Sequence, residues 1–124
     1  MLSDGALIAF SQTTQPAAAM AFYRDRLGLA LVEESPYALV FQAGGRMLRV
    51  QIVERFEPHP FTTAGWDVRD IRAVVTHLRA RGVDVERYPF LEHDADGIWW
   101  TPDGNGVAWF KDPDGNTLSL TQFV

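Results

Sequence analysis

The sequence predicts an α+β domain in which one strand–helix–strand unit occurs twice. Short apolar runs of strand character surround only two segments with helical spacing of apolar residues. The order of these elements is the same in both halves, as expected for an internal repeat. Each helical segment is followed by a glycine, Gly28 and Gly82, which can adopt the positive φ of a helix C-terminal cap.

The first half begins with a short apolar strand at residues 7–10. Thr14 and Gln15 then precede Pro16, which favours the first turn of a helix because its missing N–H needs no partner there. Apolar residues at helical spacing predict a helix over residues 16–26. Three strands are expected after it, with Gly44 and Gly45 as the turn between the last two: residues 30–32, 38–41 and 47–53.

The second half repeats this order. A strand is expected at residues 65–68, and Asp70 is the candidate N-cap of a helix whose apolar stripe includes Ile71, Val75 and Leu78. Turn sequences rich in Pro, Asp, Gly and Asn lie on either side of residues 107–111. The expected strands after this helix are residues 83–87, 97–100, 107–111 and 117–123.

Length and composition narrow the class of protein. A chain of 124 residues with 47% hydrophobic residues suits one packed domain, residues 1–124. It has no cysteine, which excludes disulfides and thiolate metal sites and suits a reducing cytoplasm. No signal peptide or membrane-spanning apolar run is visible, and a net charge of −5 with scattered arginines argues against nucleic acid. We therefore expect a cytoplasmic protein without a membrane or nucleic-acid partner.

Three motifs resemble the signatures of the vicinal oxygen chelate superfamily, which contains glyoxalases, bleomycin-resistance proteins and dioxygenases. They are AFYRDRLG at residues 21–28, GWDVRDI at 65–71 and FKDPDGN at 110–116. The resemblance implies two βαβββ modules, at residues 5–55 and 61–124, in a curved eight-stranded mixed sheet with its helices on the outer face. It also implies a cleft inside that sheet and a homodimer, in which the modules pair either within one chain or across two.

Many members of this superfamily hold a divalent metal with His, Gln or Glu side chains in the cleft. The resemblance places the four ligand positions at Ile8, Arg49, Thr63 and Ser119. A hydrocarbon, a permanent cation and two neutral hydroxyls are poor metal ligands, so we predict no metal or other cofactor. A divalent metal is expected only if its ligands are displaced, and the residues considered for that are Gln12, Gln51, Gln122 and the acidic loop 92–96 around His93. We expect all three histidines, His59, His77 and His93, to be solvated surface residues.

Strand alternation predicts which side chains face the cleft. Leu48, Val50, Leu118 and Leu120 should face the helices, which places their neighbours on the opposite side. Trp109 and one of Trp99 and Trp100 are also expected there, and packing within the core or a dimer interface is the alternative for them. The predicted ligand-binding residues are Phe10, Gln12, Arg49, Gln51, Thr63, Trp100, Trp109 and Ser119.

Arg49 is the most informative of these residues, because a lone charge in mid-strand should not be buried unpaired. We expect it to pair with Glu33, Glu34 or Asp67 rather than with an anionic ligand. Two functions remain open. The first is a metal-free protein that binds a small molecule, similar to the bleomycin-resistance branch. The second is a glyoxalase-like or dioxygenase-like enzyme that uses displaced ligands, or metal-independent acid/base chemistry around Arg49 and the loop 92–96. The first is favoured, because no nucleophile–base pair and no metal quartet is visible. The acidic net charge suits a cationic ligand and Arg49 suits a carboxylate, so the charge of the ligand stays open.

Overall fold

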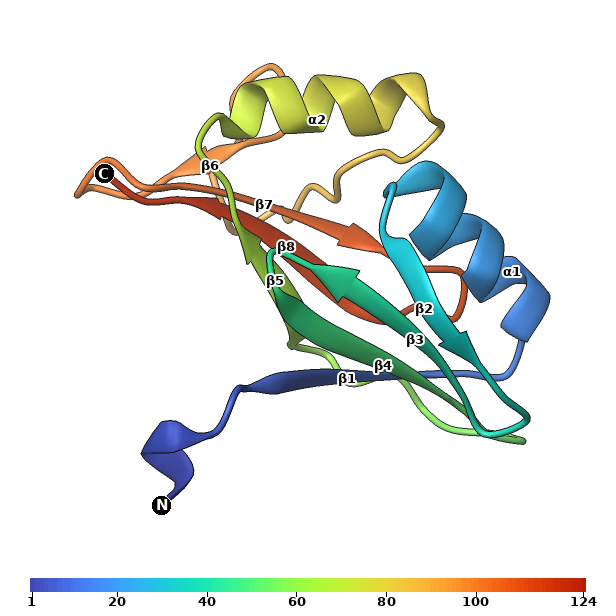
Figure 1. Ribbon diagram of the computed structural model, residues 1–124. Coiled ribbons are helices and arrows are strands. Elements are labelled where there is room, and N and C mark those ends of the chain that lie inside the picture. The colour runs from blue at the N-terminus through green and yellow to red at the C-terminus, as the bar shows by residue number, and fades with distance from the viewer.

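Two four-stranded mixed sheets form the framework of the protein, and the computed structural model describes all residues from 1 to 124 (Figure 1). Sheet A has the strand order β1-β4-β3-β2 and sheet B has the order β5-β8-β7-β6. In each sheet the first strand runs parallel to the last, and the other pairs are antiparallel. The strands are β1 (Ile8–Thr13), β2 (Ala30–Glu34), β3 (Ala38–Ala43), β4 (Arg46–Ile52), β5 (Thr62–Asp67), β6 (Trp99–Trp100), β7 (Gly106–Lys111) and β8 (Thr117–Gln122).

This architecture confirms the predicted α+β class and the repeated order of elements. The eight strands form two sheets, whose first strands β1 and β5 lie beside each other without a shared ladder. One core lies between the sheets and the helices. As the alternation predicts, it contains Leu48 and Val50 of β4 and Leu118 and Leu120 of β8. We call the side of each sheet that points away from this core its open face.

The first helical segment changes its hydrogen bonding halfway. The helix α1 (Pro16–Met20) continues as a π-helical segment, η2 (Ala21–Arg26), in which the N–H of Leu27 donates to the carbonyl of Phe22. The wider turn ends at Gly28 with φ of 76°. Phe22 and Tyr23 are both buried, with their rings edge to face at 5.2 Å. The helical run therefore anchors its first module in the core through two adjacent aromatic residues. A short 3₁₀ turn, η1 (Leu2–Asp4), precedes β1 at the exposed N-terminus.

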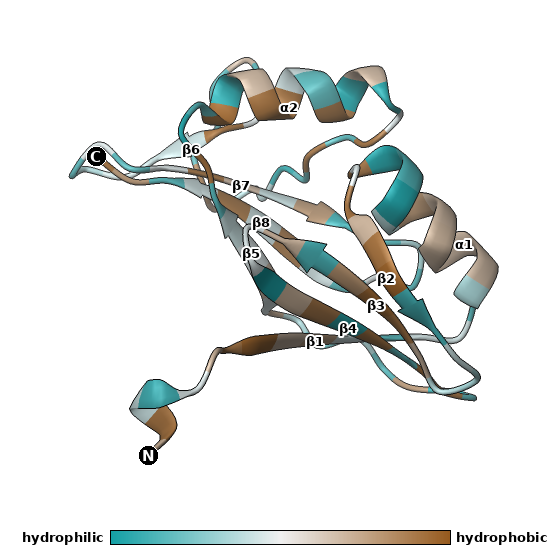
Figure 2. Ribbon diagram, viewed as in Figure 1, coloured by the Kyte–Doolittle hydropathy of each residue, from teal (hydrophilic) through white to brown (hydrophobic).

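The second helix, α2 (Ile71–Ala80), covers sheet B. The Ala73 N–H donates to Asp70 Oδ1 at 3.1 Å, so Asp70 is the predicted N-cap. Gln122 caps the same helix from β8, because its Oε1 accepts the N–H of Ile71 at 2.8 Å. Figure 2 shows the apolar side of α2 turned toward the sheet and its polar side outward. Neither helix has the length and hydropathy needed to cross a membrane.

The strand predicted at residues 83–87 does not form. This segment is extended and packs Val83 into the core, but the N–H of Glu86 makes the only backbone bond to β7, to the carbonyl of Trp109 at 2.7 Å. The chain then leaves the sheet in a loop that satisfies its own polar groups, since Arg87 donates to the carbonyls of Asp94 and Ala95. Consequently β6 is reduced to Trp99 and Trp100.

A buried polar network joins the two modules and uses residues from two of the signature motifs. Asp112 accepts the hydroxyl of Tyr23 at 2.6 Å and the side-chain amide of Asn116 at 2.8 Å. The same amide donates to the hydroxyl of Ser11 and to the carbonyl of Gln12 in β1. Burial, followed by the charge of Asp112, raises the pKa of the Tyr23 phenol well above its ordinary value. The first and last motifs of the chain therefore hold β1 against the hairpin between β7 and β8.

Candidate ligand-binding face

Three cross-strand pairs form a continuous stripe on the open face of sheet A. The parallel register of β1 and β4 places Ile8 opposite Met47, Phe10 opposite Arg49, and Gln12 opposite Gln51. These six residues are called the β1–β4 stripe below. Successive pairs are about 6–7 Å apart, because a strand rises about 3.3 Å per residue. The stripe therefore changes over about 13 Å from apolar, through an aromatic residue and a cation, to two neutral amides.

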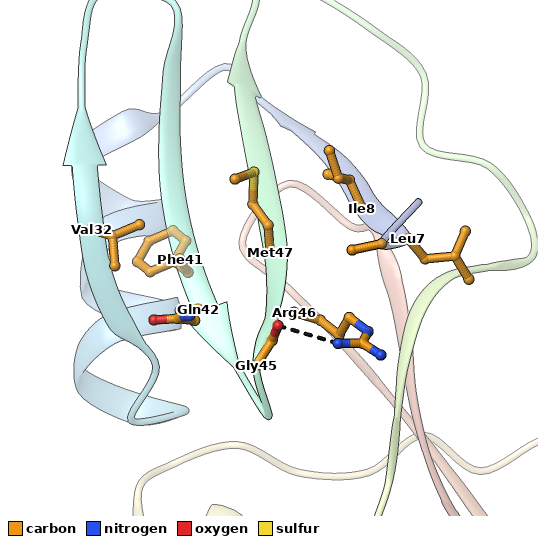
Figure 3. A pocket seen from close by; sticks show the side chains of 9 residues that line it. Leu7, Ile8, Val32, Phe41, Gln42, Gly45, Arg46 and Met47 are labelled. Atoms are coloured by element: carbon orange, nitrogen blue, oxygen red, sulfur yellow. Dashed lines mark hydrogen bonds between the residues drawn. The ribbon is translucent and has the colours of Figure 1, made fainter. Parts of the chain in front are cut away.

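The apolar end of the stripe is open to solvent. Ile8 is 42% exposed, Phe10 49% and Met47 37%, all large values for apolar residues on a sheet. A cavity of about 480 Å³ lies at this end. Figure 3 shows Leu7, Ile8 and Met47 gathered at the start of β1 and β4, with Val32 across the sheet. Ile8 holds the first superfamily ligand position, and here it forms part of an apolar wall.

The polar end of the stripe lies in a smaller cavity of about 190 Å³. Four of the eight predicted ligand-binding residues line it: Phe10, Gln12, Gln51 and Thr63. Thr63 reaches the cavity at a bulge in β5, where the register with β8 shifts between Thr62 and Ala64. The other lining residues are Ser11, Phe56, Glu57, His59 and Asn116. The structure thus brings half of the predicted set together.

Glu57 and His59 were missed by sequence reasoning. They belong to the linker between the modules, at residues 53–61, which has no strand or helix period to assign its side chains to a face. The His59 ring stacks on Phe61 at 4.8 Å and lines the cavity together with Glu57. The clustering of Phe56, His59 and Phe61 among two prolines and two glutamates was the only available signal.

The internal ion pair expected for Arg49 does not form. No acidic oxygen lies within 4.0 Å of its guanidinium, and its only side-chain hydrogen bond is a donation to the sulfur of Met47 at 4.0 Å. Arg49 is partly buried, and its cross-strand neighbours Phe10 and Val40 are apolar. Its charge therefore remains free on the open face.

The open face of sheet B is covered by its own aromatic residues. Trp109 lies opposite Ser119, and its ring stacks on Trp99 at 6.1 Å and meets the edge of Tyr88 at 5.5 Å. Ser119 is only 9% exposed and Thr117 is 4% exposed. Trp109 and Ser119 are therefore neighbours on the predicted face, and Ser119 is largely buried there.

Trp100 lies on the other side of sheet B from the predicted one. Its cross-strand partner is Gly106, where it lies near Ile71 of α2, and its indole N–H donates to Asp94 Oδ2 at 3.0 Å. Trp99 is the residue of this pair on the open face, beside Trp109. Sequence alternation alone could not choose between two adjacent tryptophans, because both are compatible with packing.

The family of the chain follows from its sequence as well as its fold. A profile of the glyoxalase/bleomycin resistance protein/dioxygenase superfamily matches residues 8–120. The chain belongs to this superfamily. No protein of curated function matches its sequence.

Solved structures of other superfamily members share the fold at low sequence identity. A putative glyoxalase family protein from Bacillus anthracis is 17% identical with a TM-score of 0.77, over 98% of this chain and 96% of that one. Lactoylglutathione lyase from Agrobacterium tumefaciens is 19% identical with a TM-score of 0.74, over 96% and 93%. A superfamily member from Sphaerobacter thermophilus DSM 20745 is 20% identical with a TM-score of 0.74, over 99% and 100%. At these identities the likeness shows the fold alone.

The residues at the superfamily's metal positions do not fit a metal in this member. Ile8 offers no donor atom, Arg49 is a cation, and Thr63 donates its hydroxyl to the carbonyl of Thr117 at 3.3 Å. The fourth position, Ser119, carries a neutral hydroxyl and is 9% exposed. No three His, Asp or Glu side chains come close enough together to hold an ion.

The acidic loop considered for displaced ligands is already paired within the chain. Asp94 and Asp96 both accept from Arg72 of α2, and Asp96 also faces Arg79 at 3.6 Å. Partial burial would raise the pKa of Asp94, but hydrogen bonds from Trp100, Ile98, Arg72 and Asp96 outweigh it and hold that pKa at about 2. The ion pairs of this loop therefore link α2 to the segment before β6.

The histidine and glutamine candidates have different positions. His93 bonds to the N–H of Tyr88 and the carbonyl of Gly97, so it closes its own loop, and His77 is exposed on α2. Gln122 caps α2 and does not reach the cleft. Only Gln12 and Gln51 of this group lie at the cavity, together with the unexpected Glu57 and His59.

Proposed function

We propose that this superfamily member binds a small organic molecule along the β1–β4 stripe, without the divalent metal typical of many of its relatives. The observation that carries the proposal is the exposure of the stripe. The apolar side chains of its first two pairs, Ile8, Met47 and Phe10, are 37–49% exposed, whereas Thr117 and Ser119 of β8 in sheet B are 4% and 9% exposed. Small-molecule sites commonly combine apolar walls with a few polar groups that orient the ligand. Along the stripe, apolar side chains are followed by polar groups, and a cavity lies at each end.

A fragment screen followed by NMR tests this proposal. Ligands should shift the backbone resonances of Phe10, Gln12 and Gln51 more than those of sheet B. A Gln12→Ala, Gln51→Ala double variant should weaken the hits at the small cavity, because it removes both side-chain amides. Thr76→Ala, an exposed change on α2, serves as the control. Hits that map elsewhere, or that bind the double variant equally well, would contradict the proposed site.

A second function, a metalloenzyme with displaced ligands, is favoured by one observation. Glu57 and His59 are a carboxylate and an imidazole that line the same cavity as Gln12 and Gln51, and such donors suit divalent cations. Elemental analysis of protein purified without added metal decides between the two functions. We expect less than one equivalent of any transition metal, unchanged in a Glu57→Gln, His59→Ala double variant. Stoichiometric metal that is lost in this variant would establish the second function instead.

We also propose that the protein is a cytoplasmic homodimer. The superfamily resemblance supports a dimer, and exposed apolar residues such as Leu7 at 85% and Val32 at 56% give it surface to bury. Light scattering should report twice the chain mass of 13.9 kDa. A single-chain mass at micromolar concentration would contradict the dimer.

A further inference from the structure

We infer that the ligand of the β1–β4 stripe is an organic carboxylate with an apolar tail, and that Arg49 binds its carboxylate. The inference rests on the proposed function and goes beyond it, because it specifies the charge and the polarity of the ligand. It begins with the position of Arg49 in the strand. Its neighbours Leu48 and Val50 are 4% and 0% exposed and are held in the core. The guanidinium must therefore emerge on the open face.

The surroundings of Arg49 make its free charge unusual within the chain. Six other arginines form no ion pair with an acid, and all six are exposed to solvent: Arg26, Arg46, Arg55, Arg69, Arg81 and Arg87. Arg72 and Arg79 face the carboxylates of Asp94 and Asp96, and Arg24 faces Asp25. Arg49 alone is partly buried, lies in mid-strand between apolar neighbours and lacks a counter-ion.

The nearest acids in the register do not neutralise Arg49. Glu33 lies on the second strand away, opposite Val40, and it makes no contact with the guanidinium within 4.0 Å. Glu57 lines the small cavity at the glutamine end. At the apolar end a second cation, Arg46, lines the larger cavity and donates to the carbonyl of Gly45 at 3.4 Å (Figure 3). The middle and the apolar end of the stripe therefore favour an anion, whereas the acid lies at the other end.

The order of polar and apolar residues along the stripe indicates where the charged and apolar parts of this anion would lie. A guanidinium presents a planar fork of N–H donors that matches a carboxylate in two parallel hydrogen bonds. One pair away, about 6–7 Å, Ile8 and Met47 offer an exposed apolar wall. A carboxylate at Arg49 would place its aliphatic or aromatic tail along Phe10 toward that wall. The amides of Gln12 and Gln51 would remain for a further polar group of the ligand.

The test uses three probes of equal length, namely hexanoate, hexanamide and hexylamine, in NMR titrations of the full chain. Hexanoate should bind at least about tenfold more tightly than hexanamide, as expected for a charge-assisted bidentate contact, and hexylamine should bind most weakly. Arg49→Gln should abolish the preference for hexanoate. Arg69→Gln, which removes an exposed arginine outside the stripe, should retain it. Thermal unfolding of both variants checks that the fold is intact.

Several outcomes would overturn the inference while leaving the proposed function standing. Equal binding of hexanoate and hexanamide, or a carboxylate preference that survives Arg49→Gln, would show that Arg49 does not select the ligand. A lack of response of the stripe to all three probes would likewise overturn the inference, and the fragment screen would then decide the proposed function separately. Butyrate should bind more weakly than hexanoate if the tail reaches the Ile8–Met47 wall, and equal affinities would exclude that placement.

The carboxylate could also be supplied by a second copy of the chain, and the same variants distinguish this source. If a glutamate of a partner copy occupies Arg49, then Arg49→Gln should shift the mass measured by light scattering toward the single chain, and hexanoate should compete with assembly. For a free small molecule we expect the mass to be the same in the wild type and in Arg49→Gln. A mass change would therefore overturn the small-molecule inference.

Discussion

The two sheets share one topology, but the side chains on their open faces differ in exposure. In sheet A, Phe10 lies opposite Arg49 and is 49% exposed, while the linker residues Phe56, Glu57 and His59 line the cavity at the glutamine end of the stripe. In sheet B, Ser119 of β8 corresponds to Arg49 of β4, and it is 9% exposed and lies opposite Trp109. The rings of Trp99 and Tyr88 pack against Trp109.

This difference indicates that the two copies of a repeated module can have different roles. An aromatic cover contributes to stability through buried area and ring contacts, and it leaves no room for a ligand. An uncovered stripe contributes less to stability but keeps its side chains available. The comparison therefore supports the proposal that a ligand contacts the open face of sheet A, whereas the aromatic residues on the open face of sheet B serve packing. The following predictions can break or sharpen this division.

The largest effect is expected where the two modules are joined. Asp112→Ala removes the acceptor for Tyr23, Asn116 and the N–H of Asp114, and leaves these buried donors without a partner. The free energy of unfolding should fall by about 3 kcal/mol. Chemical denaturation measures this change, with Asp84→Ala, an exposed acid without a hydrogen bond, as the control. A loss no larger than that of the control would mean that the network does not hold the modules together.

Trp109→Ala tests the cover of sheet B directly. Loss of a partly buried indole that contacts two aromatic rings should cost about 2 kcal/mol of unfolding free energy. Hexanoate affinity should be unchanged within about twofold, because the stripe lies on the other sheet. Denaturation and the NMR titration measure the two quantities. If the variant is stable but binds hexanoate much more weakly, ligand contact extends to sheet B and the division fails.

Acid should weaken the loop that contains Asp94 and links α2 to β6. The pKa of Asp94 is held at about 2, below its ordinary value of 3.8, so its charged form stabilises the fold above about pH 4. This contribution, on the order of 2 kcal/mol, is lost as the pH falls through about 2. Asp94→Asn should therefore reduce the dependence of unfolding free energy on pH between 4 and 2, whereas Asp103→Asn should not. Equal pH dependence in both variants would contradict the assigned pKa.

The smallest effect on stability is expected at the stripe itself. Phe10→Ala should change the unfolding free energy by only about 0.5 kcal/mol, since half of its ring is already exposed. The same change should weaken hexanoate binding several-fold, because the ring lies beside Arg49. Phe123→Ala, another exposed phenylalanine near the C-terminus, is the matched control for both measurements. A large loss of stability in Phe10→Ala would show that the stripe is a packing surface.

Sequence periodicity predicted the fold well, because the burial of one side of each strand or helix imposes a regular spacing of apolar residues. Leu48, Val50, Leu118 and Leu120 face the core as expected, and Asp70 and Gly82 begin and end α2 as expected. Residues 83–87 have the same alternation but form no ladder, because a strand also needs a neighbour for its backbone. Alternation detects a buried side, and it does not detect hydrogen-bond partners.

The candidate site was predicted only in part, because some of its residues lie in segments that have no strand or helix periodicity. Phe10, Gln12 and Gln51 are brought together because strand register follows from the pattern. Glu57 and His59 come from a linker without periodicity, so no pattern places them. The cover over Ser119 depends on the packing of distant rings, and the lack of an ion pair at Arg49 depends on distances across three strands. Such distances follow from twist and bulges, which residue types do not encode locally.

One experiment tests the central claim most directly, the assignment of ligand contact to sheet A. In an NMR titration of the wild-type protein with hexanoate, the largest shifts should fall on Ile8, Phe10, Met47, Arg49 and Gln51, with little change at Trp109 and Ser119. The Arg49→Gln variant should show no comparable shifts at the same concentrations. Shifts concentrated at Trp99, Trp109 and Ser119, or equally large shifts in Arg49→Gln, would contradict this account.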